Sequence, residues 1–256
     1  MRADPRLEIG LVASATLDIL LHTLIGKDLD SSPHSYVSGI LWLSVEGEDV
    51  KYYIRSCADD IYNCMPAREH DVEAEILSHL GEGDVFVDVG ANIGYYSVLG
   101  AKRVGRLGRV VAVEPLPANG QVLEKNVRLN SLSNVTVVNA ACWSLSSRIT
   151  LSWPPGDYGR ASAVSRRGFG RATVETVTLD FVCSELPAIK FLKIDAEGAE
   201  AEILQGGRRS LMKTKYIILE LSERKEEIVK LLQGSGFAVK PLLFPPYVMA
   251  VNEKLP

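Results

Sequence analysis

Several patterns that would assign a protein to a class at once are missing from this 256-residue sequence. Its cysteines form no C-x-x-C pair and have no histidine pair nearby, so they predict neither a metal site nor a disulfide framework. There is also no nucleophile elbow and no Walker lysine. We expect the four cysteines to be reduced thiols: Cys57, Cys64, Cys142 and Cys183.

Long uninterrupted hydrophobic runs are missing too. The most apolar segment, residues 9–26, is broken by Asp18 and His22 and lacks the basic start and cleavage site of a signal peptide. We therefore expect no membrane span and a cytoplasmic protein. Ser14, Asp18 and His22 recur every fourth residue, which predicts an amphipathic helix docked on the main domain or pairing two subunits as a homodimer.

The chain has no excess of positive charge. Its formal net charge is -4 at pH 7, and 46% of its residues are hydrophobic and 23% charged, as in ordinary soluble proteins. Bulk charge therefore gives no support for a nucleic-acid partner. A chain of this length can bury one large core.

What is present is a regular alternation of strands and helices that starts at Val72. Continuous apolar strands followed by helices predict an α/β fold with a mostly parallel sheet covered on both faces. A hairpin signal closes the chain across Pro245 and Pro246. The expected strands are residues 84–89, 108–115, 134–141, 189–195, 215–221, 237–243 and 247–252.

Two segments lie outside this alternation. Residues 1–70 read as an N-terminal extension that holds the helix and, over residues 39–57, a β-hairpin turning at Gly47. Residues 71–256 form the main domain, and residues 144–178 interrupt it with weak strands around a loop rich in glycine, proline and arginine. We interpret this insertion as a lid.

A glycine-bearing turn, Asp88-Val89-Gly90-Ala91-Asn92-Ile93-Gly94, follows the first strand of the main domain. Ligands bind at this edge of such sheets. The spacing is not the G-x-G-x-x-G of a dinucleotide site, and Asp88 would repel a phosphate. S-adenosylmethionine fits better, because Asp88 can attract its ammonium group, directly or through water, while backbone N–H groups of the turn meet its carboxylate.

The next two strands end in further candidates for the same ligand. Glu114 ends the second strand, where a carboxylate can accept both hydroxyls of a ribose. Residues 139–142 end the third strand and would line the adenine pocket. A ribose carboxylate is shared with nicotinamide-dependent oxidoreductases, so only the turn spacing separates the two classes here.

A second group of carboxylates ends the following strands. Asp195 and Glu220 should emerge side by side at the ligand edge, as a general base for an acceptor hydroxyl or as oxygen ligands of a divalent cation, although no metal site is predicted. For Glu197 and Glu200, the alternative is that they favour the first turn of the next helix. The sequence Phe-Pro-Pro-Tyr at 244–247 lies in the final hairpin and predicts a rigid turn, not a base-methylating motif.

Taken in order, the segments "FVDVGANIGYYS", "VEPLPANGQVLEKNVRLN", "VTLD", "FLKIDAEGAE" and "IILELSE" resemble the FkbM family of S-adenosylmethionine-dependent methyltransferases. The resemblance covers about residues 58–252. It implies a Rossmann-like class I methyltransferase fold, with a seven-stranded sheet and a reversed C-terminal hairpin, and most often O-methylation of small molecules or sugars.

The resemblance implies roles for individual residues, some at the reaction centre and some at the cofactor. Asp195 and Glu220 would face the reaction centre. Ser144 stands where the family often has an aspartate. The implied or expected cofactor-binding positions are Asp88, Gly90, Asn92, Gly94, Glu114, Asn139, Ala141 and Ser144.

Other functions stay open at this point. An RNA (tRNA) methyltransferase would use the same cofactor, and a non-catalytic scaffold could keep the cofactor site without the reaction. The insertion carries arginines that either recognise an anionic acceptor or form a solvated loop: Arg160, Arg166, Arg167 and Arg171.

Overall fold

The computed structural model describes residues 38–66, 68–154, 156–164, 170–221, 223–243 and 246–255. The predicted N-terminal helix, and with it the predicted dimer contact, lies outside the described residues. So do Arg166 and Arg167 of the insertion.

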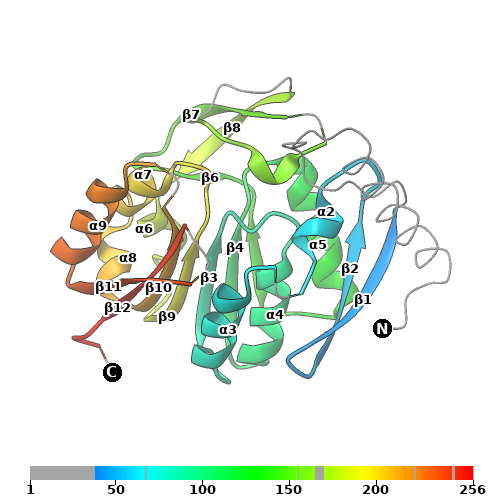
Figure 1. Ribbon diagram of the computed structural model, residues 1–256, viewed down its shortest axis with the longest axis horizontal. Helices are drawn as coiled ribbons and strands as arrows, with labels where there is room; N and C mark the ends of the chain where they lie inside the picture. Colours follow the sequence, from blue (N-terminus) through cyan, green and yellow to red (C-terminus); the bar gives the residue numbers. More distant parts are fainter. Residues whose placement is uncertain are drawn as a thin grey trace.

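A seven-stranded sheet forms the centre of the molecule (Figure 1). β12 is antiparallel to both of its neighbours, and all the other pairs are parallel, as the strand pattern and the resemblance predict. In spatial order the strands are β11 (Phe237–Pro241), β12 (Tyr247–Asn252), β10 (Thr214–Glu220), β9 (Ile189–Ile194), β3 (Val85–Val89), β4 (Arg109–Val113) and β5 (Val135–Val138).

The chain enters this sheet at its central strand. From β3 it proceeds to β4 and β5 on one side, and it then crosses to β9 and β10 on the other. The strand order therefore reverses between β3 and β9, which creates a crevice beyond the carboxyl ends of the strands. The turn after β3 opens into this crevice.

Helices cover both faces of the sheet. Side chains alternate along each strand, so Phe86 and Phe191 pack on one face while Val87 and Leu192 pack on the other. The first face is covered by α3 (His70–His79) and α4 (Tyr95–Val104), and α5 (Pro117–Leu129) lies beside α4. The second face is covered by α6 (Leu179–Val182), α7 (Glu200–Gln205), α8 (Arg208–Met212) and α9 (Lys225–Gly234). No helix in the described ranges is long and apolar enough to cross a bilayer.

The predicted N-terminal hairpin is present as β1 (Gly39–Val45) and β2 (Glu48–Ile54), followed by the short α2 (Asp60–Asn63). Glu46 and Gly47 both have positive φ (48° and 85°), as a two-residue hairpin turn requires. The buried side chains of the hairpin, Tyr52 among them, belong to the same hydrophobic core as α3 and α4. The boundary near residue 70 stays a prediction, but the hairpin has no core of its own.

A separate three-stranded sheet, β6 (Ala141–Cys142), β8 (Gly170–Val177) and β7 (Arg148–Trp153), lies at one end of the molecule (Figure 1). The predicted strand 134–141 is wrong at its end. β5 stops at Val138, whose carbonyl accepts the N–H of Ala140 at 3.1 Å in a tight turn, and Ala141 then pairs with Thr176 of β8. A 3-10 helix, η1 (Tyr158–Arg160), lies between β7 and β8.

Candidate active site

The turn after β3 is shaped by two glycines. Gly90 has φ 77°, and a Cβ there would lie 1.8 Å from the carbonyl oxygen of Asp195, so only glycine lets the end of β9 pass this close. Gly94 has φ 90°, and a Cβ there would lie 3.0 Å from the side chain of Leu123. Gly94 therefore permits the close approach of α5, and the turn is held between the end of β9 and α5.

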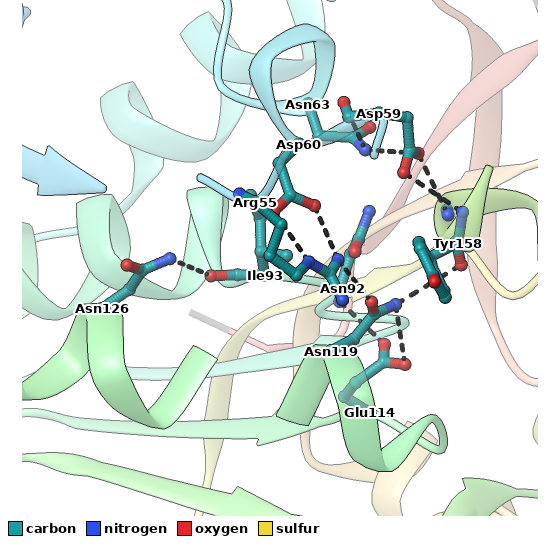
Figure 2. A network of polar contacts seen from close by, with 11 residues as sticks. Arg55, Asp59, Asp60, Asn63, Asn92, Ile93, Glu114, Asn119, Asn126 and Tyr158 are labelled. Atoms are coloured by element: carbon teal, nitrogen blue, oxygen red, sulfur yellow. Dashed lines mark hydrogen bonds and ion pairs between the residues drawn. The ribbon is translucent and has the colours of Figure 1, made fainter. Parts of the chain in front are cut away.

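Glu114 lies at the end of β4 beside this turn. Its carboxylate accepts the backbone N–H of Leu116 at 2.9 Å. It also accepts the backbone N–H of Asn92 at 2.8 Å and the Asn119 side-chain amide at 3.3 Å (Figure 2). Burial raises its pKa to about 7, although the three donors oppose the shift. The carboxylate is thus fixed in place at the strand end.

A cavity of about 580 Å³, called cavity A here, opens beside Glu114. Of the predicted residues, Gly90, Asn92, Glu114 and Ala141 line it. Much of its wall is apolar or aromatic: Val89, Val113, Pro115, Cys142, Trp143, Ile149, Leu151, Tyr158, Ala161 and Ala163.

Four of the eight predicted cofactor-binding residues do not line cavity A: Asp88, Gly94, Asn139 and Ser144. Asn139 is exposed, because β5 has already ended at Val138 and the chain turns there. Ser144 follows β6, but Trp143 reaches the cavity in its place. Within the described residues, the wall on this side is therefore formed by residues 141–143 and not by 139 or 144.

Asp88 lies behind the turn and not in it. Because side chains alternate along β3, Asp88 faces α4, where its carboxylate accepts the Ser97 hydroxyl at 2.6 Å and lies 3.8 Å from Lys193 Nζ. It is 1% exposed, and burial raises its pKa despite the nearby ammonium. Asp88 lines neither of the two cavities described here, so its role toward a ligand ammonium stays a prediction.

A second, more polar cavity of about 1120 Å³, called cavity B here, adjoins cavity A. Asp195 and Glu220 meet there as expected, because β9 and β10 are parallel neighbours paired at Ile194 and Leu219. One carboxylate oxygen from each of Asp195, Glu197 and Glu220 lies within 4.8 Å of the others. The two cavities share Gly90, Asn92, Gly159, Asp195 and Glu197.

These three carboxyl groups differ in charge. Burial disfavours the ionised form of Asp195, but Lys193 Nζ at 3.1 Å and the Tyr247 hydroxyl at 3.0 Å outweigh it and hold the pKa of Asp195 below its ordinary value. Burial, and then the charge of Asp195, raise the pKa of Glu197 to about 8 and that of Glu220 to about 9. At neutral pH Asp195 is therefore ionised, while the other two hold protons.

Glu197 and Glu200 have separate roles. Glu200 begins α7 and accepts the backbone N–H groups of Ala196 and Gly198 at 3.2 and 3.1 Å, which fits the helix-start alternative. Glu197 precedes the helix with φ 51°, a backbone conformation rare for side-chain-bearing residues, and it lines both cavities. Oxygen donors of this kind could also hold a divalent cation.

Sequence reasoning missed Lys193, Tyr247, Glu69 and Arg68 of cavity B. Tyr247 was treated as part of a rigid turn, but its hydroxyl donates to Asp195 and lies 3.3 Å from Glu69 Oε1. Arg68 Nη2 lies 2.6 Å from the same Glu69 oxygen. A signal existed only for Lys193, since a lysine between Leu192 and Ile194 near the end of a mostly apolar strand needs a buried anionic partner.

Comparisons with known proteins show the family to which the chain belongs. A family profile described as the methyltransferase FkbM domain matches residues 88–239. The hexuronic acid methyltransferase AglP of Haloferax volcanii is 26% identical over 201 residues, which is 77% of this chain and 81% of that protein. The methyltransferase sdnD of Sordaria araneosa is 30% identical over 200 residues, which is 64% of this chain and 77% of that protein.

Solved structures are more distant. An S-adenosylmethionine-dependent O-methyltransferase from Thermotoga maritima is 16% identical, with a TM-score of 0.46 over 83% of this chain and 77% of the other, and that likeness adds nothing to the assignment. The profile, in contrast, spans more than half of the chain, from the end of β3 to β11. The chain belongs to the FkbM family of S-adenosylmethionine-dependent methyltransferases.

Proposed function

We propose that this enzyme transfers the methyl group of S-adenosylmethionine to a hydroxyl oxygen of a sugar or another small acceptor, with the cofactor in cavity A and the acceptor in cavity B. The observation that carries the proposal is that the two cavities meet at Asp195 and Glu197, so that a donor and an acceptor can react there. A relative named for hexuronic acid methylation supports a sugar acceptor.

Cavity A suits the cofactor in its chemistry. Glu114 offers carboxylate oxygens for ribose hydroxyls, and apolar residues such as Ile149 suit a purine. When bound, S-adenosylmethionine supplies an electrophilic methyl group on its sulfonium. The protein supplies the alignment of that group with an acceptor oxygen.

Cavity B suits a hydroxyl-rich acceptor. Its wall carries carboxyl groups, the hydroxyls of Tyr62, Tyr96 and Tyr247, and the amide of Asn63, all of which can exchange hydrogen bonds with sugar hydroxyls. We propose that Glu220, in its ionised form, takes the proton of the acceptor hydroxyl. Asp195, which is held by Lys193 and Tyr247, orients that hydroxyl.

Arginines of the insertion could recognise an anionic acceptor. Arg160 lines cavity B, but its guanidinium lies 3.6 Å from Asp157. Arg171 is exposed on β8 and lines neither cavity. Of these two described arginines, only Arg160 is therefore placed to meet an acid group of an acceptor. A panel of matched methyl glycosides of glucose, glucuronate and glucosamine would measure this preference directly.

The first experiment is isothermal titration with S-adenosylmethionine, with NADH as the control, followed by assay of labelled methyl transfer to that panel. Stoichiometric binding of S-adenosylmethionine alone, with transfer to a sugar, is the expected result. NADH binding would favour an oxidoreductase, and salt-sensitive tRNA binding with transfer to tRNA would favour an RNA methyltransferase. Binding with no transfer to any alcohol or RNA would favour a non-catalytic scaffold.

The same assay tests the remaining proposals about the site. We expect the rate to be unchanged by EDTA, because the ammonium of Lys193 already balances the ionised Asp195. A loss of activity that magnesium restores would instead assign the three carboxyl groups of cavity B to a cation. A cytoplasmic location stays a prediction.

A further inference from the structure

One segment of the insertion, residues 158–163, contributes to the lining of cavity A, and the N-terminal extension holds it by hydrogen bonds. Building on the proposed cofactor site, we infer that Tyr158 binds the nucleoside part of S-adenosylmethionine and that Arg55 and Asp59 position it. The extension would then complete the cofactor site, although neither Arg55 nor Asp59 lines cavity A.

Tyr158 lies on the Glu114 side of cavity A. It is the first residue of η1 and lines the cavity. The side-chain amide of Asn119 donates to the Tyr158 carbonyl at 3.4 Å and to Glu114 Oε1 at 3.3 Å, so one amide ties the tyrosine to the expected ribose carboxylate (Figure 2). An aromatic ring next to a ribose site is well placed to stack on the attached base.

Asp59 holds the backbone of η1. Its Oδ1 accepts the N–H of Tyr158 at 3.1 Å and its Oδ2 accepts the N–H of Gly159 at 3.0 Å, while its own N–H donates to the carbonyl of Gly156 at 3.1 Å. Asp59 is only 2% exposed. These charge-assisted bonds fix both ends of the turn that carries Tyr158.

Arg55 holds the ring of Tyr158. Its guanidinium carbon lies 4.6 Å from the ring centroid, within the range of a cation–π contact. The same guanidinium donates to Asn119 Oδ1 at 2.9 Å and pairs with Asp60 at 2.6 Å. Arg55 and Asn119 therefore connect the extension to both Tyr158 and Glu114 (Figure 2).

Gly159 shows how tightly the three segments meet. A Cβ at this position would lie 2.6 Å from Asp59 Oδ2 and 3.2 Å from Asn92 Nδ2. The insertion is thus in contact with the extension on one side and with the turn after β3 on the other. Any residue larger than glycine here would move η1 away from one of them.

The test is the affinity of the full chain for S-adenosylmethionine, measured by isothermal titration. Tyr158→Ala should weaken binding about tenfold, and Tyr158→Phe, which keeps the ring, should bind within about twofold of the wild type. Equal affinity of the wild type and Tyr158→Ala would overturn the inference. A wild type that does not bind S-adenosylmethionine would overturn the proposed function first, and this inference with it.

A second test asks whether Asp59 positions Tyr158 or only stabilises the fold. Asp59→Ala should weaken binding severalfold, whereas Asp49→Ala, at an exposed position near the start of β2, should not. In a double-mutant cycle, Asp59→Ala should add little to Tyr158→Ala, because Asp59 acts through that tyrosine. Additive effects would assign Asp59 to general stability and overturn its positioning role. If Asp59→Ala does not fold, Arg55→Met replaces it in the same cycle with the same expected and contrary outcomes.

Discussion

Single residues on the sheet set the electrostatics of the site. Lys193 is 2% exposed and lies between two carboxylates, 3.8 Å from Asp88 and 3.1 Å from Asp195. Burial works against its charge, but the two carboxylates outweigh this and raise its pKa. A buried charge of this kind is stable only with partners, so Lys193, Asp88 and Asp195 form one unit.

The first prediction concerns Glu114. Glu114→Ala removes the carboxylate expected to accept two ribose hydroxyls, and each charge-assisted hydrogen bond of this kind contributes about 1.5–3 kcal/mol. Two such bonds correspond to a fall in affinity for S-adenosylmethionine of about 100-fold or more, as measured by isothermal titration. An unchanged affinity would remove Glu114 from the ribose site.

The second prediction is a pH dependence. A base must be ionised to act, and the pKa of Glu220 is raised to about 9 by burial and by neighbouring carboxylates. Turnover should therefore rise as the pH is increased from 7 to 9, and Glu220→Gln should reduce it about 100-fold and abolish the rise. Steady-state rates measured across this pH range test the assignment.

The variant Glu197→Gln distinguishes the general base from a neighbouring carboxylate that only raises the pKa of that base. Glu197 is one of the carboxylates that raise the pKa of Glu220, so Glu197→Gln should move the rise in turnover to lower pH and keep it. If Glu197→Gln abolished the rise and Glu220→Gln only moved it, the base would be Glu197. A rate independent of pH would point to Asp195, which is already ionised.

At the scale of elements, the hairpin and α5 form one unit with the turn after β3. The buried side chain of Asn126 on α5 accepts the N–H of Tyr53 on β2 at 2.6 Å and donates to the carbonyl of Ile93 at 2.8 Å. Asn130, one helical turn later, exchanges hydrogen bonds with both backbone groups of Lys51 at 2.9 and 2.7 Å. The helix thus satisfies the edge of the hairpin in place of a third strand.

The third prediction follows from this arrangement. Asn126→Leu leaves a buried N–H and a buried carbonyl without partners, at about 1–3 kcal/mol each. The free energy of unfolding should fall by about 2–4 kcal/mol, as measured by urea denaturation. Gln121→Ala, at an exposed position on the same helix, is the control and should change little. A loss below about 0.5 kcal/mol for Asn126→Leu would contradict the account.

The elements themselves could largely be read from the sequence. α5 begins at Pro117, since proline is favoured in the first turn of a helix, and α4 begins directly after Gly94. The hairpin turn at Gly47 and the final hairpin were also correct. The strand expected over residues 134–141 was wrong at its end. This apolar run contains a tight turn, and the residues after the turn pair with β8, some thirty residues later in the chain.

At the scale of the whole molecule, the ligand should stabilise the fold, since cavity A is built from the turn after β3, the ends of β4 and β9, and the insertion. S-adenosylmethionine at about 100 times its dissociation constant should add about 2.7 kcal/mol. For a chain of this length the melting temperature should rise by roughly 5–10 °C. NADH at the same concentration should cause no shift, and an equal shift with NADH would contradict the cofactor assignment.

The sequence alone determined the alternation of strands and helices, the glycine turn and the carboxylates at the strand ends, because these depend on local periodicity and covalent spacing. Three features were decided only by the tertiary structure. Asp88 faces α4, and Asp195 is ionised while Glu220 holds a proton. Asp59 contacts η1, which lies about a hundred residues later in the chain. Burial and partner charge arise from contacts between distant segments. For that reason the position of the candidate site could be proposed from the sequence, whereas its protonation and the residues that would complete it could not.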